Sequence, residues 1–332
     1  EAAQQSQPDM IVFHPKAFTA PDIAEKLGIP VAMALVVPGL VPTAEYPNMM
    51  LPRLKLGGWY NKLSYSFVNL LIGLSVAKHA RTWRQENNLP KAKSFSLLQT
   101  HDGTAIPVIH GFSKLVVSRP DDWPRTASIC GYWYTEDGED YEPTPELSAF
   151  LAEGLPPVYV GFGSMTGRDP ECLASMVIEA LQGAGVRGVL ATGWGGIKIK
   201  TLPQSIIAVD QVPHSWLFSR VRGVVHHGGA GTTAAALRAG KPSIVIPFFG
   251  DQPFWGDRVH TLNAGSAPIP LKRLTVDRLQ AAIEEITTDQ NMIDDAEALG
   301  MRLREEDGVE NAIATIESLA GVPNQALQRT SR

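Results

Sequence analysis

The chain has 332 residues, of which 44% are hydrophobic and 19% are charged, and its formal net charge is −5 at pH 7. This length predicts two domains with sizeable cores. The negative charge and the lack of any basic run exclude nucleic acid as the main partner, because phosphate binding needs clustered Lys and Arg.

In the N-terminal half, short apolar runs predict strands and longer periodic segments predict helices. The polar residues 1–7 are followed by an apolar run that is typical of an internal strand of an α/β domain, so we expect an incomplete N-terminal lobe. The predicted strands are 11–13, 31–36 and 114–118, and the predicted helices are 21–27, which Gly28 ends, and 59–88.

The C-terminal half alternates strands and helices more regularly. The predicted strands are 158–161, 188–192, 206–209, 221–226 and 243–247, and the predicted helices are 171–183, 232–239, 276–286 and 311–319. Such alternation predicts a parallel sheet covered on both faces. Ligands of such sheets bind at the carboxyl ends of the strands.

We therefore predict an N-terminal lobe over residues 1–134, a linker rich in Glu, Asp and Pro over 135–157, a second lobe over 158–320 and a disordered tail over 321–332. The last helix is also expected to pack back on the first lobe. Two distant cysteines, Cys130 and Cys172, give no zinc spacing and fit a reducing compartment.

A cytoplasmic location is expected, since there is no secretory signal and no run of about 18 apolar residues that could span a membrane. The best candidate, residues 63–77, is interrupted by three serines and an asparagine. We interpret it as an amphipathic helix that packs on the core or lines a pocket. Contact of this helix with a membrane surface stays open, although no basic anchor is evident.

The most informative segment is 224–233, where an apolar strand ends in two histidines, followed by Gly228, Gly229, Ala230 and Gly231 and then a helix that begins with Thr232 and Thr233. Small residues allow close approach of a bulky anion, and helix N-termini offer free N–H groups to phosphate. Together with a histidine donor, which a raised pKa would make cationic, this pattern predicts a diphosphate site that needs no metal. The alternative is a tight turn with a buried histidine.

Other candidate residues follow neighbouring strands. Asp251 and Gln252 could bridge vicinal sugar hydroxyls, because a carboxylate accepts hydrogen bonds and an amide both donates and accepts them. The Gly-Phe-Gly-Ser segment ending at Ser164 predicts a phosphate or ribose contact. Trp194 offers a flat face for a base, with simple packing as the alternative.

Taken together, these motifs resemble the sterol 3β-glucosyltransferase branch of the nucleotide-sugar glycosyltransferases with the GT-B fold. The resemblance covers roughly residues 8–320. Its motifs are 161–165, 193–194, 211–218, 225–233 and 247–256, with 42–47, 120–124 and 131–133 in the first lobe. It implies two Rossmann-like lobes with a cleft between them, and inverting transfer of glucose from UDP-glucose to the hydroxyl group of a sterol or other lipid, without a metal or cofactor.

By position, the resemblance implies that His227 binds the diphosphate, with the backbone of 228–233 beside it. It also implies that the backbone of Val212 reads uracil and that Asp251 and Gln252 hold the donor sugar. The family's first strand and Gly-rich loop, which carries the catalytic base, has no counterpart before Pro8. The catalytic residue is therefore unassigned, and His14 and Asp9 are only weak candidates.

Three other functions stay open at this point. The same donor motifs suit transfer to a polyketide or peptide aglycone. A UDP-sugar-binding protein without transfer activity would need no base. A sugar-nucleotide epimerase fits less well, since it would need several acids in the cleft.

Overall fold

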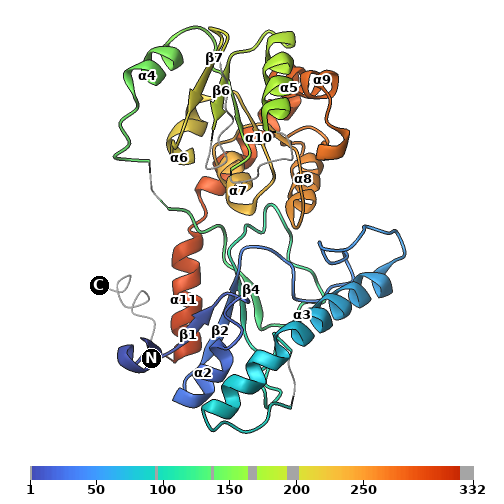
Figure 1. Ribbon diagram of the computed structural model, residues 1–332, viewed down its shortest axis with the longest axis vertical. Helices are drawn as coiled ribbons and strands as arrows, with labels where there is room; N and C mark the ends of the chain where they lie inside the picture. Colours follow the sequence, from blue (N-terminus) through green and yellow to red (C-terminus); the bar gives the residue numbers. More distant parts are fainter. Residues whose placement is uncertain (1, 94–95, 136–137, 164–169, 193–201, 322–332) are drawn as a thin grey trace. The chain divides into compact units, whose positions relative to one another are not determined.

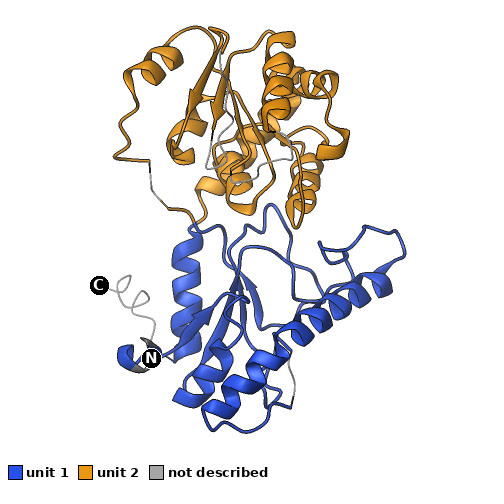
Figure 2. Ribbon diagram, viewed as in Figure 1, with its two compact units in different colours: residues 1–133, 307–332 blue, residues 134–306 orange. Residues whose placement is uncertain are grey.

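The computed structural model describes residues 2–93, 96–135, 138–163, 170–192 and 202–321 (Figure 1). The chain forms two compact units (Figure 2). Unit 1 comprises residues 1–133 and 307–332, and unit 2 comprises residues 134–306. Each unit is an α/β layer structure around one parallel sheet, as the alternation of strands and helices predicts.

Unit 1 contains a four-stranded parallel sheet in the order β1-β2-β3-β4. Its elements are α1 (Ala2–Ser6), β1 (Ile11–Phe13), α2 (Ala20–Leu27), β2 (Val31–Leu35), α3 (Gly58–Glu86), β3 (Val108–His110), β4 (Ala127–Ile129) and α11 (Gly308–Ala320). The register pairs Ile11 with Val31 and Met33 with Val108. The predicted strands 11–13 and 31–36 and the long helix 59–88 are confirmed to within two residues.

The strand predicted at 114–118 is wrong. Val116 and Val117 are buried, but their amides donate to the carbonyl of Ser113, while the Ser113 hydroxyl accepts a hydrogen bond from the amide of Leu115. A serine that bonds its following amides stabilises a turn at the expense of a strand. The strands of this region are instead β3 and β4, which the sequence reading missed.

The predicted domain boundaries also need correction. Helix α11 belongs to unit 1, where Ala312, Ile316 and Leu319 pack against Ala32 of β2 and Ile109 of β3. The expectation that the last helix packs on the first lobe is therefore right, whereas its assignment to a second lobe over 158–320 is wrong. The predicted tail from 322 onward lies outside the described residues.

Unit 2 also includes most of the segment predicted as a linker. Helix α4 (Pro145–Ala152) is capped by the Thr144 hydroxyl, which accepts a hydrogen bond from the Leu147 amide. Leu147 is 1% exposed, and Phe150 and Leu151 pack against the core of this unit. The packing of these three side chains explains why residues 145–152 form a helix despite the acidic and proline-rich composition around them.

The sheet of unit 2 has five parallel strands in the order β7-β6-β5-β8-β9. Its remaining elements are β5 (Val158–Gly161), α5 (Pro170–Gly183), β6 (Gly188–Ala191), β7 (Ile206–Val209), α6 (His214–Leu217), η1 (Phe218–Arg220), β8 (Gly223–His226), α7 (Ala230–Arg238), β9 (Ser243–Val245), α8 (Gln252–Thr261), η2 (Leu271–Arg273), α9 (Val276–Thr288) and α10 (Gln290–Arg304). All five predicted strands of this half are confirmed.

Both faces of this sheet are buried. Val158 and Val160 of β5 contribute to one apolar cluster together with α5 and α9, whereas Tyr159 between them points into a second cluster with α6 and η1. Successive strand residues point to opposite faces. The sequence of a strand that is covered on both sides is therefore a continuous apolar run. This pattern allowed these strands to be predicted.

Candidate functional site

The strand order of unit 2 creates a switch point between β5 and β8. From β5 the chain adds β6 and β7 on one side, and β8 and β9 then continue on the other side. Gly161, the last residue of β5, pairs with His226, the last residue of β8. In open α/β sheets the ligand crevice lies outside the carboxyl ends of the strands at such a point. The structure thus brings the 162–163 and 227–229 segments to the expected ligand position.

The turn after β8 places the start of α7 at this position. His226 is fully buried, and its Nδ1 accepts a hydrogen bond of 3.1 Å from the amide of Gly228. Gly229 is the N-cap residue, and α7 begins at Ala230. The first amides of a helix lack partners within the helix and carry a partial positive charge. An exposed helix N-terminus of this kind can bind an anion, so the diphosphate site predicted from the sequence stays a prediction that this geometry permits.

Two glycines of this turn have different roles. Gly228 has φ +88°, and a Cβ there would lie 2.6 Å from Val245 Cγ1, whereas a Cβ on Gly231 would meet nothing within 4 Å. We expect Gly228→Ala to lower the free energy of unfolding by roughly 1–3 kcal/mol through backbone strain alone. Gly231→Ala lies inside the helix and should leave stability unchanged or raise it by up to about 1 kcal/mol.

Urea denaturation of both variants measures the changes in the free energy of unfolding. Titration with UDP then shows whether either substitution also lowers the affinity for the nucleotide. If the open side of Gly231 admits phosphate, Gly231→Ala should weaken UDP binding without loss of stability. Equal stability of the two variants would contradict the assignment of Gly228 to a structural role.

His227 lies between two glycines at the switch point. A Cβ on Gly229 would be 2.6 Å from His227 Nε2, and a Cβ on Gly163 would be 3.4 Å from His227 Cε1, so both glycines make room for this ring. Its buried Nδ1 has no hydrogen-bond partner in the described part of the chain. A buried polar atom without a partner needs an explanation, and a ligand is one.

The condition under which His227 would be cationic, a raised pKa, is not met. Burial lowers the pKa of His227, and the nearby carboxylate of Asp251 only partly opposes this effect. The ring is therefore neutral at pH 7. A neutral imidazole still has one N–H group that can donate to a phosphate oxygen.

The threonines at the start of α7 are not equivalent. Thr233 is 0% exposed, and its hydroxyl donates a 2.9 Å hydrogen bond to the carbonyl of Gly229, so it stabilises the helix start. Thr232 is half-buried and lies on the first turn of the helix. Of the two predicted hydroxyl donors, only Thr232 is therefore available for a ligand.

Asp251 and Gln252, the predicted sugar contacts, lie directly before and at the start of α8. Asp251 accepts a 2.8 Å hydrogen bond from Trp255 Nε1. Gln252 is 5% exposed, and its Oε1 accepts hydrogen bonds from the amides of Phe248 and Phe249 at 2.7 and 3.1 Å. The Gln252 oxygen therefore shapes the preceding loop, and only its amide nitrogen remains for a sugar hydroxyl.

The predicted base-binding residues are described in part. Val212 follows β7 and is partly buried against the apolar cluster on one face of the sheet. His214, two residues later, stacks on Phe218 and lies 3.4 Å from the Tyr159 hydroxyl through its Nε2. The predicted contacts Ser164 and Trp194 lie outside the described residues.

In unit 1 the structure joins two of the motifs noted in the sequence. The Asp122 carboxylate accepts hydrogen bonds from the Thr43 hydroxyl at 2.7 Å and the Ala44 amide at 2.9 Å, and it forms a 3.0 Å ion pair with Lys62. Glu45 in turn accepts a 2.9 Å hydrogen bond from the amide of Asp121. The 42–47 and 120–124 segments thus hold each other in place.

The two weak base candidates lie at opposite ends of strand β1. His14 directly follows β1 and is exposed, and its Nδ1 accepts a hydrogen bond from the Lys16 amide. Asp9 precedes β1 and so lies at the amino end of the strand, away from the edge where ligands bind in such sheets. His14 is therefore the better placed of the two.

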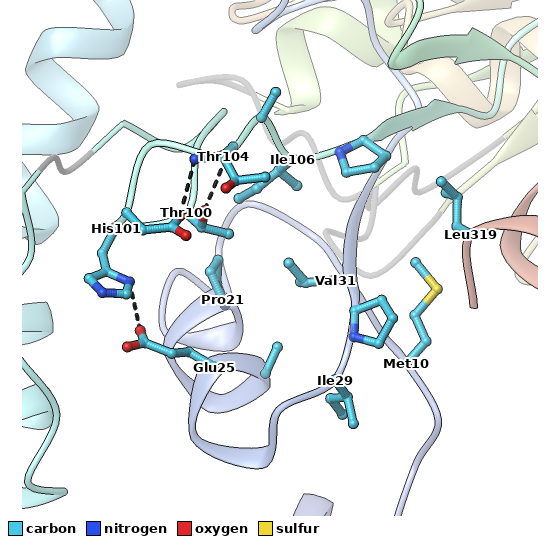
Figure 3. Close-up of a pocket in the computed structure, with 15 residues that line it drawn as sticks. Met10, Pro21, Glu25, Ile29, Val31, Thr100, His101, Thr104, Ile106 and Leu319 are labelled. Atoms are coloured by element: carbon cyan, nitrogen blue, oxygen red, sulfur yellow. Dashed lines mark hydrogen bonds and ion pairs between the residues drawn. The ribbon is translucent and has the colours of Figure 1, made fainter. Parts of the chain in front are cut away.

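A cavity of about 420 Å³ in unit 1 was not expected from the sequence (Figure 3). It lies at the amino ends of the strands, with Met10 and Leu319 on one side and Glu25 and His101 on the other. Its lining comes from segments far apart in the chain, so no local motif indicates it.

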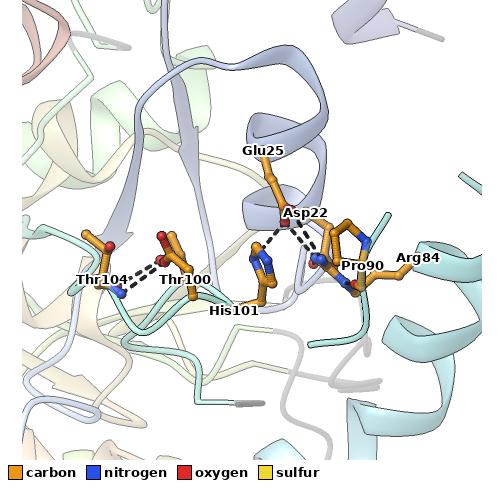
Figure 4. A network of polar contacts seen from close by, with 8 residues as sticks. Asp22, Glu25, Arg84, Pro90, Thr100, His101 and Thr104 are labelled. Carbon is orange, nitrogen blue, oxygen red and sulfur yellow. Dashed lines mark hydrogen bonds and ion pairs between the residues drawn. The ribbon is translucent and has the colours of Figure 1, made fainter. Parts of the chain in front are cut away.

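Beside this cavity, four charged or titratable side chains form a network (Figure 4). Arg84 is 2% exposed and pairs with Asp22 and with Glu25, the latter at 2.7 Å, and Glu25 also contacts His101 Nδ1 at 2.7 Å. Burial alone would lower the pKa of Arg84, but its hydrogen bonds with Glu25 and Asp22 raise it. This network joins α2, α3 and the loop before β3.

Within the described ranges, no group of three or more His, Cys, Asp and Glu side chains is arranged to hold a metal ion. No described helix is both long and apolar enough to cross a membrane. Cys130 is buried and Cys172 is exposed.

Comparison with solved structures identifies the fold. The glycotransferase of kitacinnamycin superposes with a TM-score of 0.71 over 97% of this chain and 78% of that chain, at 20% identity. The glycosyltransferase VinC in complex with DTDP gives 0.64 over 96% and 74%, at 18% identity. The protein therefore has the GT-B fold of the nucleotide-sugar glycosyltransferases.

Sequence comparison places the chain more closely. It is homologous to the sterol 3-beta-glucosyltransferases, which confirms the resemblance of its motifs. It is 38% identical to UGT80A2 of Arabidopsis thaliana over 92% of this chain and 47% of the relative, and 38% identical to the Aspergillus terreus enzyme over 93% and 22%. The chain thus spans 47% of the length of the plant relative and 22% of the length of the fungal one. Residues 194–312 also match the family model of the erythromycin biosynthesis protein CIII-like C-terminal domain.

Proposed function

We propose that this chain binds UDP-glucose and transfers its glucose to the hydroxyl group of a sterol or related lipid. The observation that carries the proposal is the β8–α7 turn. It places the helix N-terminus and the unpartnered Nδ1 of His227 together at the switch point of a GT-B sheet. Both the plant and the fungal relatives are named for this reaction.

The proposed reaction is a displacement at the anomeric carbon, in which negative charge develops on the leaving group. The acceptor oxygen attacks the anomeric carbon, the bond from this carbon to UDP breaks, and the configuration inverts in a single displacement. The leaving diphosphate gains negative charge, which the amides of α7 and the N–H group of His227 stabilise. We propose that these groups take the place of a metal ion. A base must take the acceptor proton, and the described residues do not assign it beyond the placement of His14.

A second candidate is transfer to a macrolide-type aglycone, which the match to the erythromycin CIII-like model favours. That match covers residues of the donor unit, so it bears on the donor more than on the acceptor. We also propose a cytoplasmic location, because the chain has only two cysteines, Cys130 and Cys172, and they lie far apart in the sequence.

Transfer is tested by incubating the chain with UDP-glucose and EDTA, together with either cholesterol or a macrolide aglycone, and by measuring the glucoside by mass spectrometry. We expect a steryl glucoside with EDTA present. Product from the aglycone alone would support the second candidate. UDP-glucose binding without any glucoside would make this chain a binding protein and contradict the proposal.

A further inference from the structure

The outward face of α3 is apolar. Five of its exposed side chains recur at spacings of three or four residues and so form one stripe along the helix: Trp59 (66% exposed), Leu63 (56%), Phe67 (48%), Leu70 (58%) and Leu74 (64%). The preceding segment adds Met50, Leu54 and Leu56, which are also exposed. A contiguous exposed apolar patch of this kind marks a surface that binds a partner or a membrane.

The inward face of the same helix carries several polar side chains, and hydrogen bonds fix them in place. Asn61 Nδ2 donates to the Ala44 carbonyl at 2.7 Å, and Asn69 Nδ2 donates to the Leu40 carbonyl at 3.0 Å. The Ser64 hydroxyl accepts a 2.7 Å hydrogen bond from the Asn48 amide. The helix cannot rotate its leucines inward without breaking these bonds. These hydrogen bonds therefore determine that the leucines are exposed in unit 1, in which α3 is the long cyan helix (Figure 1).

The charged side chains of the segment that forms this face all have the same sign. Residues 46–85 contain six Lys and Arg residues and no Asp or Glu, in a chain whose net charge is −5. Two of these cations are compensated, because Arg84 is buried with Asp22 and Glu25, and Lys62 pairs with Asp122. Lys55, before Trp59, and Lys78, after Leu74, are exposed and lie near the two ends of the stripe.

We infer that this face, formed by residues 50–56 and the outward side of α3, docks on an anionic lipid bilayer. Apolar side chains on one side of a helix enter the boundary between headgroups and acyl chains, while flanking cations bind anionic headgroups. A second copy of this chain fits less well, because a two-fold contact would bring the same cations together. The inference adds to the proposed function the surface through which a lipid acceptor would reach the enzyme. Only this role in supplying the acceptor rests on the proposed function; binding to a bilayer does not.

Flotation with lipid vesicles in the absence of UDP-glucose tests the inference. The full chain is mixed with vesicles of phosphatidylcholine, with or without phosphatidylserine. A triple variant, Leu63→Gln with Leu70→Gln and Leu74→Gln, removes the stripe. Leu155→Gln is the matched control, since Leu155 is 70% exposed and lies outside this face. Lys55→Gln with Lys78→Gln tests the charges, with Lys272→Gln as its control.

We expect the native chain to float with vesicles that contain phosphatidylserine. The triple variant should bind about 100-fold more weakly, because each leucine loses part of its burial energy. The double lysine variant should bind roughly 25-fold more weakly, at about fivefold per charge near an anionic surface. Both controls should bind like the native chain.

Three results would overturn the inference: no flotation of the folded native chain, a triple variant that binds as well as Leu155→Gln, or a dimer of the native chain that the triple variant loses. Far-UV circular dichroism confirms that each variant is folded. Because no UDP-sugar is present, loss of flotation leaves the donor site untouched, and a chain that floats but transfers no glucose refutes only the proposed function.

Discussion

Replacing Arg84 by Met is expected to lower the free energy of unfolding by about 3–5 kcal/mol. The guanidinium is 2% exposed and pairs with Asp22 and Glu25 from α2, while its Nε donates a 2.8 Å hydrogen bond to the Pro90 carbonyl. Burial already raises the pKa of Asp22 against the lowering effect of Arg84. Without the arginine, two carboxylates would remain beside each other with no buried cation to compensate them.

Urea denaturation followed by circular dichroism measures this loss. Lys62→Met is the matched control, because Lys62 also pairs with a carboxylate but is 55% exposed. Exposed ion pairs contribute about 0–1 kcal/mol. Arg84→Met with Asp22→Asn should recover part of the loss, since it removes one of the stranded charges. If Arg84→Met is no more destabilising than Lys62→Met, the network in Figure 4 does not stabilise unit 1.

Stability should also fall steeply in mild acid because of two buried histidines. Burial lowers the pKa of His226 to about 3, assisted by His227 and His214, and lowers the pKa of His110 to about 4. In the unfolded chain both rings titrate near 6.5. The native state therefore keeps them neutral while the unfolded state takes up protons.

The contribution of these two neutral rings to the free energy of unfolding is fully present above about pH 6.5. It is lost as the pH falls from there toward about 4 for His110 and toward about 3 for His226. Each ring contributes a slope of up to about 1.4 kcal/mol per pH unit within its window. Urea midpoints measured between pH 7 and pH 5 should follow this slope. His226→Asn should remove about half of it, and an unchanged slope in that variant would show that His226 does not titrate as described.

The sequence predicts unit 2 well because its sheet is covered on both faces. Strands such as β5 and β8 are then short apolar runs, whereas α7 begins at Ala230, two residues before the predicted Thr232. The position of His227 directly after a strand also follows from the sequence, but the switch point became known only with the strand order. The roles of Thr233 and Gln252 do not, because their hydrogen bonds to nearby backbone groups become visible only in the folded turn.

Unit 1 was harder to predict for two physical reasons. Val116 and Val117 have strand propensity, yet the hydrogen bonds of Ser113 make them a buried turn. Helix α3 could be predicted as a helix, but its sequence alone does not show that the stripe of leucines and aromatic residues faces outward. That orientation depends on the carbonyls of Leu40 and Ala44, which are more than fifteen residues away in sequence.

Titration calorimetry of this chain with UDP-glucose in EDTA, alongside His227→Ala, tests the donor-site assignment most directly. We expect micromolar binding by the native chain and binding weaker by about 10- to 100-fold in the variant, as for loss of one hydrogen bond to a charged group. Leu155→Gln should bind like the native chain. Equal affinity of native chain and His227→Ala, or no binding by a folded native chain, would contradict a nucleotide-sugar site at the β8–α7 turn.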